Sequence, residues 1–102
     1  MDLRRYRVAA SCFEPDTTQL LDQRRQALGA HVTALLEEQR PDLLVLPELV
    51  LLPDFHDHPW CGAEPLEGPT VALAAELAAR YSANLCLPIV EADGELLFNS
   101  AV

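Results

Sequence analysis

The sequence predicts one α/β domain built on a parallel sheet, in the order strand, helix, strand, long loop, helix and β-hairpin. Three observations support this fold class. Residues 43–46 form an unbroken apolar run, which is typical of strands that are covered on both faces. A helical spacing of apolar residues precedes that run, so strand, helix and strand form a right-handed crossover. A second helical pattern then leads into two further apolar segments, at residues 84–91 and 95–102.

The first strand is predicted over residues 6–13, an apolar run bounded by charged residues. Asp16, with Gln19 three residues later, has the spacing of a helix N-cap and its reciprocal partner. The helix that follows ends near Arg40, because Pro41 cannot continue it. Helical spacing predicts an inward face made of Leu21, Arg24, Leu28, His31, Val32, Leu35 and Leu36. On this face His31 is expected to be a structural residue rather than a ligand.

The second strand is predicted over residues 42–47. Residues 53–68 then form a loop that is too long for a simple connector, and we interpret it as a candidate functional loop. Gly68 and Pro69 start the second helix, with proline at its first position.

The end of the chain predicts a β-hairpin. Asp93-Gly94 stands between two apolar runs, so residues 95–102 are expected to pair antiparallel with residues 84–91. Natural termini are usually polar and exposed, whereas this chain stops inside an apolar run. We therefore expect residues 1–102 to be a single, apparently truncated domain.

Composition excludes several classes of function. The 102 residues include 16 acidic and 7 basic ones, for a formal net charge of -9, and so acidic a chain repels nucleic-acid phosphates. All 7 basic residues are arginines, so a mechanism that needs lysine is incomplete in this chain. No apolar stretch approaches the roughly 20 residues that cross a bilayer, and we expect no targeting signal at the N-terminus. Three cysteines without tight spacing suit reduced thiols, which predicts a cytoplasmic protein.

Glu48 is the principal candidate for chemistry. It follows the second predicted strand, and ligands of open α/β sheets bind beyond the carboxyl ends of parallel strands. Its sequence neighbours are apolar, which predicts partial desolvation of the kind that suits a general base. The alternative is a structural glutamate that turns outward to water or caps the following loop.

Other chemical groupings are weaker. His56, His58 and Cys61 are of types that bind zinc, but their spacing matches no standard zinc motif, so we expect no metal. Ser11 lacks the elbow motif of a serine hydrolase, and a serine triad is not predicted.

Residues 43–49, Leu-Leu-Val-Leu-Pro-Glu-Leu, resemble the glutamate motif of the nitrilase superfamily, the carbon-nitrogen hydrolases. The resemblance covers almost the whole chain in order. It includes residues 6–15 as a first strand and its exit, 68–70 as the start of the second helix, and 83–90 with 93–94 and 98–102 as the next hairpin.

The resemblance implies the N-terminal part of an αββα sandwich and hydrolysis of non-peptide C–N bonds in nitriles, amides or carbamoyl compounds. In that family a Glu-Lys-Cys triad acts without metal or organic cofactor, and Glu48 resembles its general base. The lysine and the nucleophilic cysteine would follow later in the chain. Cys12, Cys61 and Cys86 do not match the nucleophile motif, so the 102 residues alone are expected to be inactive.

The same resemblance makes Phe55, His56, His58 and Trp60 candidates for shaping access of a small amide or nitrile substrate. It also implies a homo-oligomer, or association through an exposed sheet edge. The alternative function is a non-catalytic α/β interaction module, or an inactive truncated protein, in which Glu48 is structural.

Overall fold

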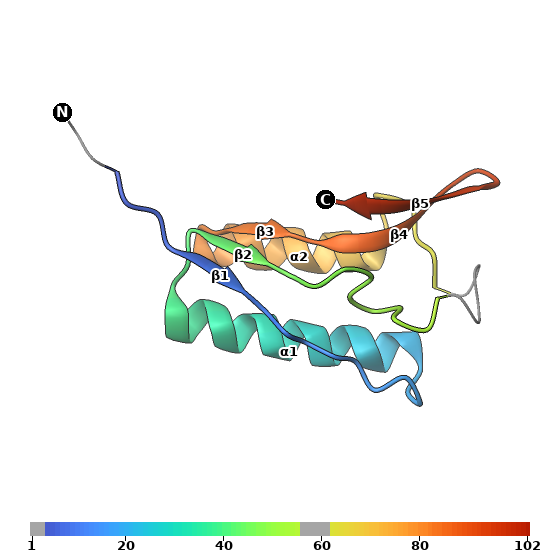
Figure 1. Ribbon diagram of the computed structural model, residues 1–102, viewed down its shortest axis with the longest axis horizontal. Coiled ribbons are helices and arrows are strands. Elements are labelled where there is room, and N and C mark those ends of the chain that lie inside the picture. Colours follow the sequence, from blue (N-terminus) through green and yellow to red (C-terminus); the bar gives the residue numbers. More distant parts are fainter. Residues whose placement is uncertain (1–3, 56–61) are drawn as a thin grey trace.

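The computed structural model describes residues 4–55 and 62–102, and it confirms a mixed α/β fold with a parallel sheet. Two helices and five strands are present in this part of the chain (Figure 1). They are β1 (Val8–Ala10), α1 (Leu21–Gln39), β2 (Leu43–Val45), α2 (Pro69–Tyr81), β3 (Asn84–Cys86), β4 (Pro88–Asp93) and β5 (Leu96–Ala101).

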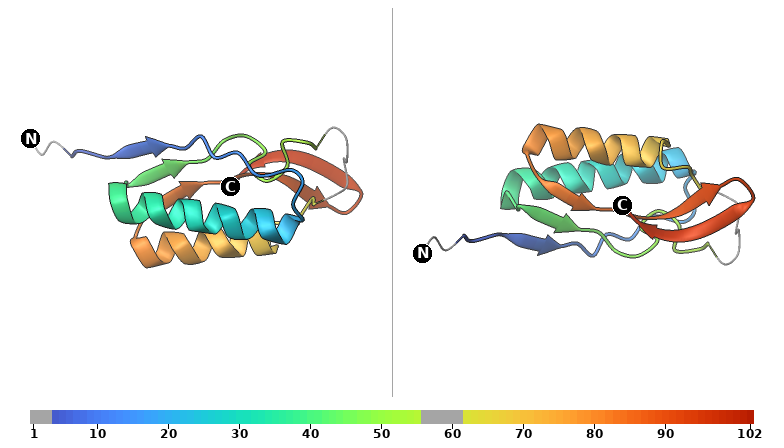
Figure 2. Two further views of the ribbon diagram at one scale, coloured as in Figure 1. Left: turned by 90° about the horizontal axis from the view of Figure 1, so that it is seen from below. Right: turned by 90° about the horizontal axis from the view of Figure 1, so that it is seen from above.

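The first three strands form a parallel sheet in the order β1-β2-β3. Its middle row aligns Ala9, Leu44 and Leu85, and Leu44 is fully buried. Figure 2 shows α1 and α2 side by side on one face of this sheet. The crossover of a strand, a helix and a parallel strand is therefore present as predicted.

The core lies between this sheet and the two helices. In α1 the buried side chains recur every fourth residue, at Arg24, Leu28, Val32 and Leu36, which confirms the predicted inward face. The three leucine and valine side chains of this series, Leu28, Val32 and Leu36, meet the buried Leu77 of α2 in one apolar cluster. Arginine occupies the first position of this buried series, where a hydrophobic residue would normally stand.

The start of α1 differs from the prediction. Asp16 is not the N-cap, since the helix begins at Leu21. The Asp16 carboxylate instead accepts the hydroxyl and the backbone N–H of Thr18, at 2.6 and 3.0 Å, and these hydrogen bonds hold the pKa of Asp16 below its usual range. Gln23 caps the start of α1 instead, because its Oε1 accepts the backbone N–H of Leu20 at 3.2 Å.

The predicted strand over residues 84–91 is two strands in two sheets. β3 completes the parallel sheet, whereas β4 pairs antiparallel with β5. Pro88 has no N–H to donate to a ladder, and Leu87 just before it exchanges two backbone hydrogen bonds with Val102, at 2.8 and 2.9 Å. The change of sheet therefore falls at Leu87-Pro88.

The predicted strands 6–13, 42–47 and 95–102 are all shorter in the structure, by up to five residues. One helix start and one hairpin turn match their predictions. Pro69 is the first residue of α2, and Gly94, with a φ of 59°, takes the first central position of the β4–β5 turn, where hairpins favour glycine. Over residues 4–55 and 62–102, neither helix has the length and apolarity needed to cross a membrane.

Candidate functional site

Glu48 lies just beyond β2, at the carboxyl edge of the parallel sheet. Two residues before it, the N–H of Leu46 still donates to the carbonyl of Cys86 at 3.1 Å. Directly after it, Leu49 adopts the left-handed conformation with a φ of 49°, which is strained for a leucine. The chain therefore turns sharply at Glu48, and the turn separates its side chain from the strand.

A cavity of about 260 Å³ opens beside Glu48, between the turn after β2 and the β4–β5 hairpin. Among the described residues, only Glu48 and Asn99 contribute polar side chains to its wall. The remaining lining residues are Leu49, Phe55, Val90, Leu97 and Phe98. The cavity is thus an apolar pocket with two converging polar groups, as is usual for small-molecule sites.

Asn99 of β5 contacts the candidate base directly. Its Nδ2 donates to Oε1 of Glu48 at 2.8 Å, across 51 residues of sequence. Sequence reasoning gave Asn99 no role. A signal was present, because Asn99 interrupts the apolar run of the last strand with an amide.

The expected desolvation of Glu48 is wrong for this structure, in which its side chain is exposed. Two apolar residues close to it in sequence are buried in the core, while Glu48 itself is not. Leu46 and Val50 are 3% and 2% exposed and belong to the hydrophobic core. Burial of these neighbours therefore does not bury the carboxylate.

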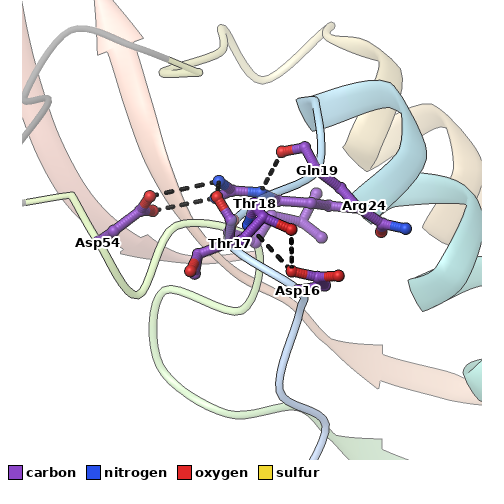
Figure 3. A network of polar contacts seen from close by, with 7 residues as sticks. Asp16, Thr17, Thr18, Gln19, Arg24 and Asp54 are labelled. Atoms are coloured by element: carbon purple, nitrogen blue, oxygen red, sulfur yellow. Dashed lines mark hydrogen bonds and ion pairs between the residues drawn. The ribbon is translucent and has the colours of Figure 1, made fainter.

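The segment after Glu48 is held to α1 by Arg24, shown in Figure 3. The guanidinium forms a two-pronged ion pair with Asp54, at 3.0 Å to Oδ1 and 3.2 Å to Oδ2. Its other donors reach the backbone carbonyls of Thr17, Gln19 and Leu51, at 2.7, 3.1 and 3.0 Å. All five N–H donors of the side chain are thereby used, and Arg24 is a structural anchor of this segment.

The far end of the long loop is held by Glu64. Its backbone pairs with β4, donating to the carbonyl of Val90 at 3.0 Å and accepting from Ala92 at 2.8 Å. Its buried carboxylate accepts the hydroxyl of Thr70 and, at 3.0 Å, the backbone N–H of Thr70. Since Thr70 lies in the first turn of α2, Glu64 caps that helix. Arg25 completes the cluster with a hydrogen bond of 3.0 Å to the Thr70 hydroxyl.

The other candidates fall into three groups. Phe55 is half-buried in the cavity wall, whereas His56, His58, Trp60 and Cys61 lie outside the described residues. His31 is half-buried, bonded to Ser11 at 2.5 Å and packed against the ring of Phe13. In the described part of the chain, no three His, Cys, Asp or Glu side chains gather as the ligands of a metal ion would.

Comparison with known proteins identifies a structural relative. Neither a family model nor a curated protein matches the chain. Among solved structures, a protein from Xanthomonas campestris with an arsenic adduct in its active site superimposes with a TM-score of 0.66 at 25% sequence identity. That relative is a CN-hydrolase superfamily protein. The match covers 95% of this chain and 35% of the relative, so the chain corresponds to part of a CN-hydrolase fold.

Proposed function

We propose that this chain is the N-terminal part of a carbon-nitrogen hydrolase, which cleaves non-peptide C–N bonds in amides, nitriles or carbamoyl compounds, and that it contributes Glu48 as general base. The observation that supports this most is the match of 95% of the chain to a CN-hydrolase superfamily protein. Glu48 stands at the carboxyl edge of the sheet, where such folds bind ligands, and it borders a cavity of about 260 Å³.

In the proposed mechanism the Glu48 carboxylate accepts the proton of a cysteine thiol as the sulfur attacks the substrate carbon. The protonated carboxyl then returns this proton to the leaving nitrogen. In the second half of the cycle the carboxylate takes a proton from the water that hydrolyses the thioester, and it returns this proton to the cysteine sulfur as the C–S bond breaks. The lysine of the triad would belong to the remaining part of the polypeptide, because these 102 residues contain no lysine. The nucleophile would belong there too, because none of the three cysteines of this chain matches its motif.

The proposed fold of the whole protein is an αββα sandwich, of which this chain supplies one helical layer and part of one sheet. The placement of α1 and α2 on the same face supports this (Figure 2). The opposite face would then meet the second sheet. Within the same proposal Phe55, His56, His58 and Trp60 shape substrate access, and Phe55 already borders the cavity.

The test is an ammonia-release assay on a panel of small amides, nitriles and carbamoyl compounds, with the full polypeptide that the gene encodes. Glu48→Gln keeps the shape of the side chain but removes the base, so we expect a loss of about 10²- to 10⁴-fold in kcat. Glu38→Gln is the matched control, since Glu38 is an exposed glutamate of α1, and it should retain wild-type activity. Equal activity of the wild type and Glu48→Gln would refute the assignment of the base.

A second candidate function is a non-catalytic interaction module. It is favoured by Val8, which is 62% exposed on the edge strand β1. An exposed apolar edge can pair with another strand, in a second copy or in a different protein. A full polypeptide that is folded and inert on the whole panel, but dimeric in sedimentation, would support this function over the hydrolase.

A further inference from the structure

The β4–β5 hairpin brings an amide donor to the candidate base. We propose that Asn99 is a positioning residue, whose Nδ2–H···Oε1 hydrogen bond of 2.8 Å fixes the Glu48 carboxylate in orientation and leaves Oε2 to accept the proton. This inference rests on the proposed function of Glu48.

Backbone hydrogen bonds hold the β4–β5 hairpin, and with it Asn99, in place beside Glu48. Asn99 pairs in register with Val90, and β4 is tied on its other side to Glu64 by backbone hydrogen bonds of 3.0 and 2.8 Å. The turn after Glu48 is joined to the same strand, because the N–H of Val50 donates to the carbonyl of Pro88 at 3.4 Å. Both partners of the 2.8 Å bond are thus held by one hydrogen-bonded unit, as an oriented catalytic group requires.

The group that donates to Glu48 is the neutral side-chain amide of Asn99. An amide N–H is a neutral donor, which restrains the rotation of the carboxylate without placing a net charge beside it. Asparagine therefore suits a carboxylate that must be held in one orientation.

The residue after Asn99 in β5, Ser100, provides a matched control for the Asn99 variants. One residue after Asn99, the hydroxyl of Ser100 donates to Oε1 of Glu91 at 2.7 Å. Neither Ser100 nor Glu91 is among the residues that line the cavity, so this second contact to a glutamate lies outside it. Ser100→Ala removes a similar hydrogen bond from the same strand without touching Glu48.

The experiment compares Asn99→Ala, Asn99→Asp and Ser100→Ala in the full polypeptide, by steady-state kinetics across pH and by thermal unfolding. Loss of one hydrogen bond to a charged group predicts a fall in kcat of about 10- to 100-fold for Asn99→Ala, with little change in KM. Asn99→Asp has nearly the shape of asparagine but repels Glu48 at neutral pH. It should lose more activity than Asn99→Ala and regain part of it at acidic pH, where the pair can share a proton. Ser100→Ala should match the wild type in kcat.

The possible results separate the two proposals. If Glu48→Gln abolishes activity while Asn99→Ala keeps wild-type kcat, the positioning role is refuted and the hydrolase remains. The role is also refuted if Asn99→Asp is as active as the wild type at neutral pH, or if Ser100→Ala loses as much as Asn99→Ala. If the wild type cleaves no member of the panel, the proposed function fails, and the positioning role fails with it.

Discussion

Replacing Arg24 by methionine removes the anchor between α1 and the segment after Glu48. Methionine keeps much of the apolar stem but none of the donors that reach Asp54 and three backbone carbonyls. Removing one member of a buried ion pair costs about 3–5 kcal/mol. The side chains of Arg24 and Asp54 are 9% and 26% exposed, so water can partly solvate Asp54 in the variant. We therefore expect a loss near the lower limit, about 3 kcal/mol in the free energy of unfolding.

Urea unfolding with linear extrapolation measures this loss, and the chain offers a matched arginine as control. Arg80 pairs with Glu76 on the surface of α2, where the two side chains are 55% and 62% exposed, so Arg80→Met should cost less than about 1 kcal/mol. Arg24→Lys should fall between the two variants, because lysine keeps the charge but lacks the planar fork. If Arg24→Met is no less stable than Arg80→Met, the anchoring role of Arg24 is refuted.

Three further predictions concern backbone strain, close packing and pH. Leu49→Gly should be less destabilising than Leu49→Ala by about 1 kcal/mol in urea unfolding, because only glycine relieves the positive φ of 49°; equal losses would contradict this. Gly68→Ala should lower stability by about 1–3 kcal/mol in thermal unfolding, since its Cβ would stand 2.9 Å from both Oε1 of Glu64 and the backbone carbonyl oxygen of Pro65; an unchanged melting temperature would contradict this. The hydrogen bond to Glu37 raises the pKa of Tyr81, so this contribution to stability is complete below about pH 10 and is lost as the pH rises through the folded-state pKa. Tyr81→Phe should therefore have a flatter stability profile at alkaline pH, and identical slopes for the two proteins would argue against the linkage.

The elements that follow from local chemistry were predictable from the sequence. The apolar run before Pro47 is the central strand of the parallel sheet, Pro69 starts α2, and Gly94 lies in the hairpin turn. The start of α1 was misplaced because Asp16 bonds to Thr18 in a local turn, an alternative that these residues always offer to the backbone.

The candidate site was only partly predictable. Glu48 could be identified because ligands of open α/β sheets bind beyond the carboxyl ends of parallel strands, and applying this rule requires only the order of the elements. Asn99 could not be connected with it, because the two residues are 51 positions apart and meet only through the change of sheet at Leu87. The pairing of Arg24 with Asp54, 30 positions apart, likewise depends on how the turn after Glu48 packs on α1.

The long separation between Glu48 and Asn99 has a consequence for synthesis. A ribosome adds about 5–20 residues per second, so roughly 3–10 s pass between the incorporation of Glu48 and that of Asn99, 51 residues later. The central strand β2 and helix α1 are synthesised before this interval begins or as it begins, and β5 only at its end. The glutamate would then wait, solvated and without its amide partner, until the hairpin closes. Stalled or prematurely released chains that end before β5 would carry the carboxylate but not the group that orients it.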